Sequence, residues 1–232
     1  MQAFFETHFD AAYLSTVILM GAYMVKKSRN KKQYLLFGLM ALILGLGDSF
    51  HLIPRAVALN SSGLENFTAA LGIGKFITSI TMTGFYVILY YVWRNRYSIK
   101  GKNHLTISVY ALSIIRILLC LFPQNGWTSS NPSIAWGIYR NIPFSILGLL
   151  IIILFYTSTI GGVDKPFRHM WLTIVLSFAF YIPVVLWGDA YPLIGMLMIP
   201  KTCAYVWTIW IGYSDLKRQL GQMKSITPCL TK

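Results

Sequence analysis

The segment Leu42–Arg55, LILGLGDSFHLIPR, carries three ionisable side chains at the end of an apolar run. Asp48, His51 and Arg55 stand at positions i, i+3 and i+7, a spacing that places them on one face of a helix. A carboxylate beside an imidazole could act as a general acid and base, and a guanidinium could bind an anion. These residue types therefore allow either a catalytic site or an anion-binding site.

Further cations lie inside apolar segments. Arg116 is near the middle of such a segment, and Lys201 lies about 14 Å from the nearer end of its own, at 1.5 Å per helical residue. An arginine or lysine near the bilayer centre costs at least about 2.5–3.5 kcal/mol, so both side chains are expected to face the protein interior. The candidate ligand-binding residues are therefore Asp48, His51, Arg55, Lys75, Arg116, Arg140, Asn141, Lys201 and Tyr205.

Charge balance indicates what such a site would bind. Asp48 lies well inside an apolar segment and can neutralise one deep cation, either Lys201 or Arg116. At least one buried cation is then left without a protein partner, and an anionic ligand is its natural complement: a carboxylate, a phosphate or a lipid head group. No metal or other cofactor is expected, because His51 is the only histidine within an apolar segment.

The elements that hold these residues are predicted to be membrane-spanning helices. Hydrophobic residues make up 56% of the chain and charged residues 12%, about half the charged fraction of a soluble domain. The apolar runs do not alternate with the period of two that barrel strands require. The chain is therefore predicted to be one domain, residues 1–232, an all-α bundle of seven transmembrane helices near residues 9–25, 34–53, 72–93, 105–122, 134–158, 170–188 and 192–213.

The basic residues indicate an orientation. Fifteen of the twenty Lys and Arg residues lie in the connections after the first, third and fifth predicted helices and in the C-terminal tail. The positive-inside rule then puts the C-terminus in the cytoplasm and the N-terminus outside, with the plasma membrane as the expected location. Topology accounts for the net charge of +13, so membrane lipids are expected as partners and nucleic acid is not.

A lipid hydrolase is the first alternative. The segment Gly47–Pro54, GDSFHLIP, resembles the second-helix motif of the lysoplasmalogenase family, polytopic enzymes that cleave the vinyl ether of lysolipids. The resemblance covers these residues alone, and the chain has one predicted helix fewer than that family. It implies Asp48 as the acid and base, with Asp189 as its partner and His51 beside them.

A retinal protein is the second alternative. Seven helices, an outer N-terminus and a lysine deep in the last helix are typical of such proteins, and Phe180–Gly188, FYIPVVLWG, resembles the sixth helix of microbial rhodopsins. That resemblance implies Lys201 as the retinal-binding residue. The third predicted helix departs from the family, because it lacks the Arg and Asp counter-ion pattern.

A transporter or receptor is favoured over both alternatives. GDSFHLIP at Gly47 and GDAYPLIG at Gly188 share residues in register and would end the second and sixth helices, as in a parallel repeat. Four prolines fall in the outer halves of predicted helices: Pro54, Pro143, Pro183 and Pro200. Such prolines are expected to kink helices and free carbonyls around a site. The leading prediction is an outward-facing, net-positive polar pocket that binds an anionic small molecule or lipid head group for transport or sensing.

Overall fold

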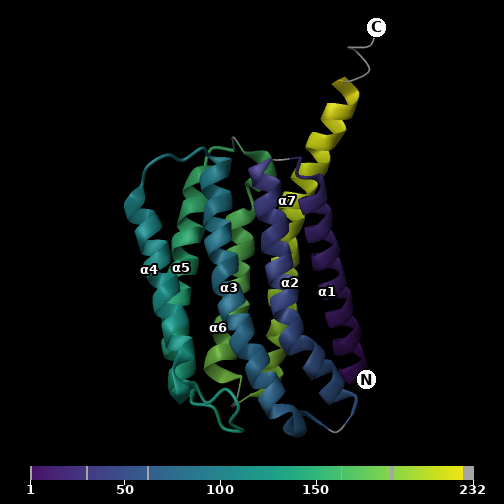
Figure 1. Ribbon diagram of the computed structural model, residues 1–232, viewed down its shortest axis with the longest axis vertical. Helices are drawn as coiled ribbons and strands as arrows, with labels where there is room; N and C mark the ends of the chain where they lie inside the picture. The colour runs from purple at the N-terminus through teal and green to yellow at the C-terminus, as the bar shows by residue number, and fades with distance from the viewer. Residues whose placement is uncertain (1, 30, 62, 163, 189–190, 227–232) are drawn as a thin grey trace.

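The computed structural model describes residues 2–29, 31–61, 63–162, 164–188 and 191–226. In these segments the chain forms long helices that lie side by side and run alternately in opposite directions (Figure 1). The long helices are α1 (Gln2–Lys27), α2 (Lys32–Leu59), α3 (Thr68–Arg96), α4 (Asn103–Leu121), α5 (Ile134–Thr159), α6 (Met170–Trp187) and α7 (Met198–Ile226). Short 3-10 helices lie in four connections: η1 (Leu64–Phe67), η2 (Pro123–Asn125), η3 (Lys165–Phe167) and η4 (Pro192–Leu197).

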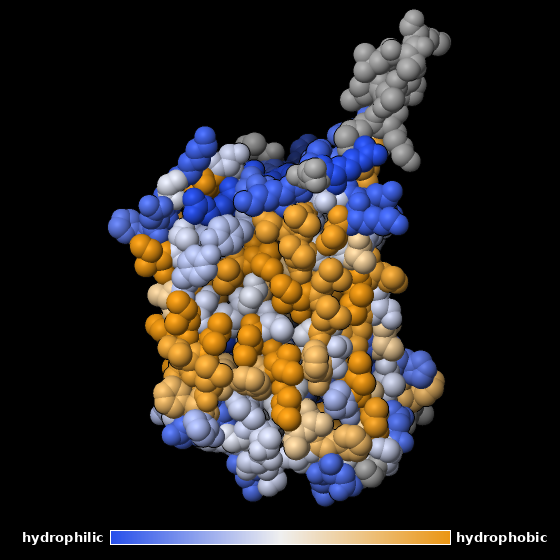
Figure 2. Space-filling view, in the orientation of Figure 1, coloured by the Kyte–Doolittle hydropathy of each residue, from blue (hydrophilic) through white to orange (hydrophobic). Residues whose placement is uncertain are grey.

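Length and hydropathy mark six of the described helices, α2 to α7, as able to cross a membrane. Figure 2 shows the matching surface on one face of the bundle, an apolar band across the middle with hydrophilic side chains toward the ends. The prediction of an all-α protein with membrane-spanning helices is confirmed at this level. The first helix is not among the six, because its apolar stretch between Asp10 and Lys26 is shorter than the roughly 20 residues that a span takes.

The first helix is nevertheless an integral part of the bundle. It packs along α2 and α7, and Tyr13, Val17 and Met24 on it are buried in the common core. A side chain added at Gly38 of α2 would meet the backbone nitrogen of Val25 at 2.8 Å. Backbones in such close contact require glycine, which is how helices commonly associate in membranes.

The second helix is longer than predicted. It runs to Leu59 instead of residue 53, with Pro54 inside it. Pro54 has no N–H group for the carbonyl of Phe50 one turn earlier. That carbonyl lies against Gly74 of α3, where any side chain would collide with it. The absence of a side chain at Gly74 leaves room for the freed carbonyl, so the proline is accommodated without ending the helix.

The last helix also differs from the predicted span. Residues 192–197 form η4, and α7 then runs from Met198 to Ile226, past the end of the bundle (Figure 1). Pro200 therefore stands in the first turn of α7, where no intrahelical donor is lost, and not farther inside the helix as predicted. The extension beyond residue 213 follows from Leu, Lys, Arg and Gln residues, which favour helix without a need for tertiary packing.

The proposed repeat does not have matching local structure in its two copies. Gly47 lies within α2, which continues for three more turns, whereas α6 ends at Trp187 and Gly188 follows it. Gly47 and Gly188 therefore lie in different local structures. The expectation that both segments end helices is wrong for the first segment.

The basic end of the bundle is closed by a polar network that we call the Arg96 clamp: Tyr34, Arg96, Asp164 and Asp215. Arg96, near the end of α3, donates to both carboxylate oxygens of Asp164 at 2.7 and 2.9 Å and to Asp215 of α7 at 3.0 Å. Tyr34 of α2 donates to the same oxygen of Asp215 at 2.7 Å. The clamp thus connects α2, α3, α7 and the α5–α6 connection. From the sequence, Arg96 was predicted only as one of the basic residues that set the orientation in the membrane, and its role in this network was not predicted.

Candidate functional site

The polar residues at the centre of the bundle come from all seven long helices. We call them the central polar cluster: Tyr13 (α1), Asp48 (α2), Tyr86 (α3), Arg116 (α4), Asn141 (α5), Ser177 and Tyr181 (α6), and Lys201 and Tyr205 (α7). Asp48, Arg116, Asn141, Lys201 and Tyr205 were predicted from the sequence as site residues. Tyr13, Tyr86, Ser177 and Tyr181 were not, because a single tyrosine or serine within an apolar run is common in a helix core.

Asp48 has a tyrosine as its direct partner. The Tyr13 hydroxyl donates to Asp48 Oδ2 at 2.6 Å. The ion pairs found among the described residues are Arg55–Glu6, Arg96–Asp164 and Arg96–Asp215, so the predicted pairing of Asp48 with Lys201 or Arg116 is not a direct ion pair. Lys201 does lie near enough for its charge to act on Asp48. The tyrosine takes the position of the expected direct ion pair.

Lys201 is surrounded by aromatic rings. Its Nζ atom lies 4.6 Å from the centroid of the Tyr181 ring and 5.5 Å from that of Tyr205. The electron-rich faces of two rings attract an ammonium group, at about 0.5–2 kcal/mol each. These contacts hold the cation within the bundle while leaving its formal charge to be neutralised by Asp48 at longer range.

Arg116 is the most unusual side chain of the cluster. It is only 2% exposed, and its Cζ atom lies 3.3 Å from the centroid of the Phe144 ring. Its Nε and Nη1 atoms are buried and have no hydrogen-bond partner within the described structure. Taking a guanidinium out of water costs several kcal/mol, more than one aromatic contact returns. These two donors are therefore the unpaired polar groups of the central polar cluster in the described structure.

Packed aromatic rings form the wall around Arg116. The Tyr86 and Phe144 rings meet edge to face at 5.0 Å, and Phe178 lies 5.1 Å from Phe144. Tyr181 donates to Asn141 Oδ1 at 2.9 Å, and the hydroxyls of Tyr86 and Ser177 are 3.3 Å apart. The rings of the wall are apolar and the hydroxyls of Tyr86, Ser177 and Tyr181 have partners, so the donors without a partner are those of Arg116.

The other predicted site residues lie toward the end opposite the Arg96 clamp and have partners of their own. Arg55 pairs with Glu6 of α1, and His51 Nδ1 lies 3.2 Å from the carbonyl oxygen of Leu71. Asp48 and Arg55 contact α1, whereas His51 contacts the start of α3, so the direct partners of these three side chains come from two different helices.

Two further cations complete this end. Arg140 donates to Asn125 Oδ1 at 2.8 Å and stacks on Trp127, with Cζ 4.3 Å from the ring centroid. Lys75 is exposed. Asp189, the carboxylate that hydrolysis would need beside Asp48, lies outside the described residues. The hydrolase and retinal hypotheses therefore stay predictions from the sequence.

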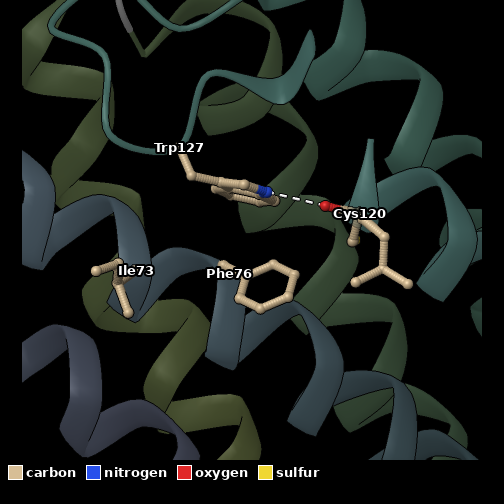
Figure 3. A pocket seen from close by; sticks show the side chains of 5 residues that line it. Ile73, Phe76, Cys120 and Trp127 are labelled. Atoms are coloured by element: carbon tan, nitrogen blue, oxygen red, sulfur yellow. Dashed lines mark hydrogen bonds between the residues drawn. The ribbon is translucent and has the colours of Figure 1, made fainter. Parts of the chain in front are cut away.

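A pocket of about 200 Å³ opens between α3, α4 and the α4–α5 connection at the same end (Figure 3). It is lined by Ile73, Phe76, Cys120, Leu121 and Trp127. The Trp127 indole donates to the carbonyl of Cys120 at 2.9 Å, which holds the ring over Phe76. Cys120 and Cys203 are free thiols. Among the described residues no group of His, Cys, Asp or Glu side chains could hold a metal ion.

Comparison with models of protein families, with curated proteins and with solved structures finds no match to this chain. The function is therefore inferred from the geometry of the central polar cluster.

Proposed function

We propose that the central polar cluster binds an anion, either a small molecule or a lipid head group. The observation that carries this proposal is the pair of unpartnered donors on buried Arg116. Lys201 adds a second cation, and Asp48 is the carboxylate within reach of it. Two cations and one carboxylate leave a net positive charge, which a bound anion would neutralise while accepting the free hydrogen bonds of the guanidinium.

We also propose the topology in which this site works. The chain crosses the plasma membrane seven times, with α1 as the first span and the N-terminus outside. The packing of α1 against α2 and α7 supports its place in the membrane. The basic residues at the α1–α2, α3–α4 and α5–α6 connections, at the end with the Arg96 clamp, support a cytoplasmic location for that end. Anions would then enter from outside, because the clamp ties helices together at the inner end.

Transport or sensing is the use that fits such a site. The cluster takes residues from all seven helices, so an anion bound there contacts every element that could move relative to the others. Loss of the clamp contacts would open the inner end and complete a transport cycle, whereas a fixed clamp would leave a binding protein.

Thermal shift assays on the purified protein test anion binding first. Chloride, acetate and phosphate are compared at equal ionic strength, with gluconate as the reference salt for general screening. One of the three should raise the melting temperature in proportion to the logarithm of its concentration, as mass action requires. Arg116→Gln should remove this shift, and Arg168→Gln, at an exposed arginine, should keep it.

Lys201→Gln serves as a second variant if Arg116→Gln does not fold, and it should weaken the same shift. Equal melting temperatures in all salts, for a folded wild-type protein, would overturn the proposal. Counterflow of the active anion in liposomes then separates the two uses: flux means transport, and binding without flux means sensing.

A further inference from the structure

The pocket beside Trp127 has the size and lining of a site for one aromatic ring. Its volume of about 200 Å³ exceeds that of an engineered protein cavity of about 150 Å³ that binds benzene. Phe76 and Trp127 form a corner with ring centroids 5.6 Å apart at an angle of 60°, and Ile73 lies beside them (Figure 3). Flat aromatic groups pack well against such edge-to-face pairs.

The pocket adjoins the unpartnered cation. Cys120 lines the pocket, and Arg116 stands one turn earlier on the same face of α4, a rise of about 6 Å. The Cys120 side chain is buried and lies close to the charges of Arg116 and Arg140. The Cys120 side chain therefore lies between the apolar pocket and the buried guanidinium of Arg116.

The opposite wall also carries a positive charge. Arg140 stacks on Trp127 with its Cζ atom 4.3 Å from the ring centroid. An indole between a guanidinium and an apolar pocket favours a ligand that is apolar at one end and anionic at the other.

We propose that the anion is an aromatic carboxylate, whose ring fills the pocket lined by Phe76 and Trp127 and whose carboxylate meets Nε and Nη1 of Arg116. This inference deepens the proposed function and rests on it, because it names the ligand class of the same cation. The ring enters between α3 and α4, and Cys120 moves aside to let the carboxylate reach the guanidinium.

Benzoate is the probe, and two relatives separate its parts. Acetate keeps the carboxylate without the ring, and benzamide keeps the ring without the charge. Burial of roughly 55 Å² of apolar surface corresponds to a factor of ten in affinity, and a phenyl ring buries more than that. Isothermal titration of the purified protein should therefore show benzoate binding at least about tenfold more tightly than acetate, with no measurable binding of benzamide.

Variants locate the ring. Ile73→Trp fills the pocket without changing any group of the central polar cluster, and it should reduce benzoate affinity about tenfold or more while leaving acetate affinity unchanged. Ile107→Trp, at a position of α4 that is 64% exposed, is the matched control and should bind benzoate as the wild type does. Quenching of tryptophan fluorescence by benzoate should diminish in Trp127→Phe.

The outcomes distinguish this inference from the proposed function. If acetate or chloride binds and benzoate binds no more tightly, the aromatic carboxylate is excluded while anion binding stands. If a lysophosphatidate binds but benzoate neither binds nor displaces it, the ligand is a lipid head group and this inference is wrong. If no anion binds to folded protein, both proposals fail. Benzoate binding that is unaffected by Ile73→Trp would remove the ring from this pocket and overturn the inference.

Discussion

Single side chains at the centre of this protein are stabilised by rings and hydroxyls more than by opposite charges. Asp48 accepts from Tyr13, Lys201 lies over Tyr181, and Arg116 lies over Phe144. Neutral partners leave the positive charge available to a ligand, which a direct salt bridge would have consumed. This arrangement is suited to binding an anion reversibly.

The Tyr13 hydroxyl should matter for stability because it is the direct donor to a carboxylate within the bundle. Tyr13→Phe leaves Asp48 without that hydrogen bond, and bonds to charged groups contribute about 1.5–3 kcal/mol. We expect a lower melting temperature, measured by a thiol-reactive or intrinsic fluorescence assay. Tyr139→Phe removes a hydroxyl from a side chain that is 52% exposed and should change the melting temperature little. Equal effects of the two variants would contradict the importance of this bond.

The long-range attraction between Asp48 and Lys201 can be measured with a double-mutant cycle. Asp48→Asn and Lys201→Met each leave the other charge uncompensated, so each should destabilise the protein. The double variant should be more stable than the sum of the two losses predicts, by about 0.5–3 kcal/mol. Melting temperatures of the four proteins provide the test, and strictly additive losses would mean that these charges do not interact.

At the scale of helices, glycines and a single arginine decide how the elements meet. Gly74 lets α3 approach the freed carbonyl of Phe50, and Gly38 lets α2 approach α1. At the basic end Arg96 connects α3 to α7 and to the α5–α6 connection. Helix contacts of this kind place Asp48 and Lys201 in the same cluster even though they are far apart in the chain.

Gly74→Ala should destabilise the protein, because its Cβ atom would collide with the Phe50 carbonyl. Overpacking of this kind costs about 1–3 kcal/mol. Gly84 is a matched control in the same helix, since a Cβ atom there meets nothing within 4 Å. Gly84→Ala should leave stability unchanged or raise it by about 1 kcal/mol through helix propensity. A thermal melt that ranks Gly74→Ala at or above Gly84→Ala would contradict this account of the α2–α3 contact.

Arg96→Gln should loosen the basic end. The change leaves Asp164 and Asp215 without their cation, and loss of one partner of a buried pair costs about 3–5 kcal/mol, reduced here because Arg96 is partly exposed. Hydrogen exchange should increase at the ends of α3 and α7 that meet in the clamp. Arg168→Gln, at an exposed arginine of the same end, should not have this effect. Unchanged exchange in Arg96→Gln would mean that packing alone closes this end.

For the molecule as a whole, the apolar band and the uneven distribution of cations are the dominant features. The helices α2 to α7 supply the band, and the side chains at the end with the clamp are hydrophilic (Figure 2). The connections at that end are rich in basic residues. The orientation of the protein in the membrane is defined by the end of the bundle that faces the cytoplasm.

Cysteine labelling in intact cells tests the orientation. With the native cysteines replaced, Ser61→Cys lies in the α2–α3 connection and Lys100→Cys in the α3–α4 connection, both at exposed positions. An impermeant maleimide should label Ser61→Cys in intact cells and Lys100→Cys only after permeabilisation. The reverse pattern would place the Arg96 clamp outside and invert the proposed direction of entry.

Local composition is enough to predict several features of this protein. Helices in the apolar runs, the concentration of cations in alternate connections and the deep positions of Arg116 and Lys201 follow from hydropathy and spacing alone, because a bilayer selects for them one segment at a time. The predicted ends of α2 and α7 differ from those in the structure. Pro54 is accommodated by a glycine on another helix, and the helical tail of α7 extends beyond the bundle.

The contacts between side chains that are far apart in the sequence depend on the tertiary structure. The partner of Asp48 is Tyr13, thirty-five residues away, and the clamp joins Arg96 to Asp215 across 119 residues. A sequence gives the depth of a charge but not its neighbours, because rotation of each helix about its axis is fixed by packing against the others. For that reason the predicted salt bridge was replaced by a tyrosine, and the pocket beside Trp127 emerged only when α3, α4 and their following connection came together.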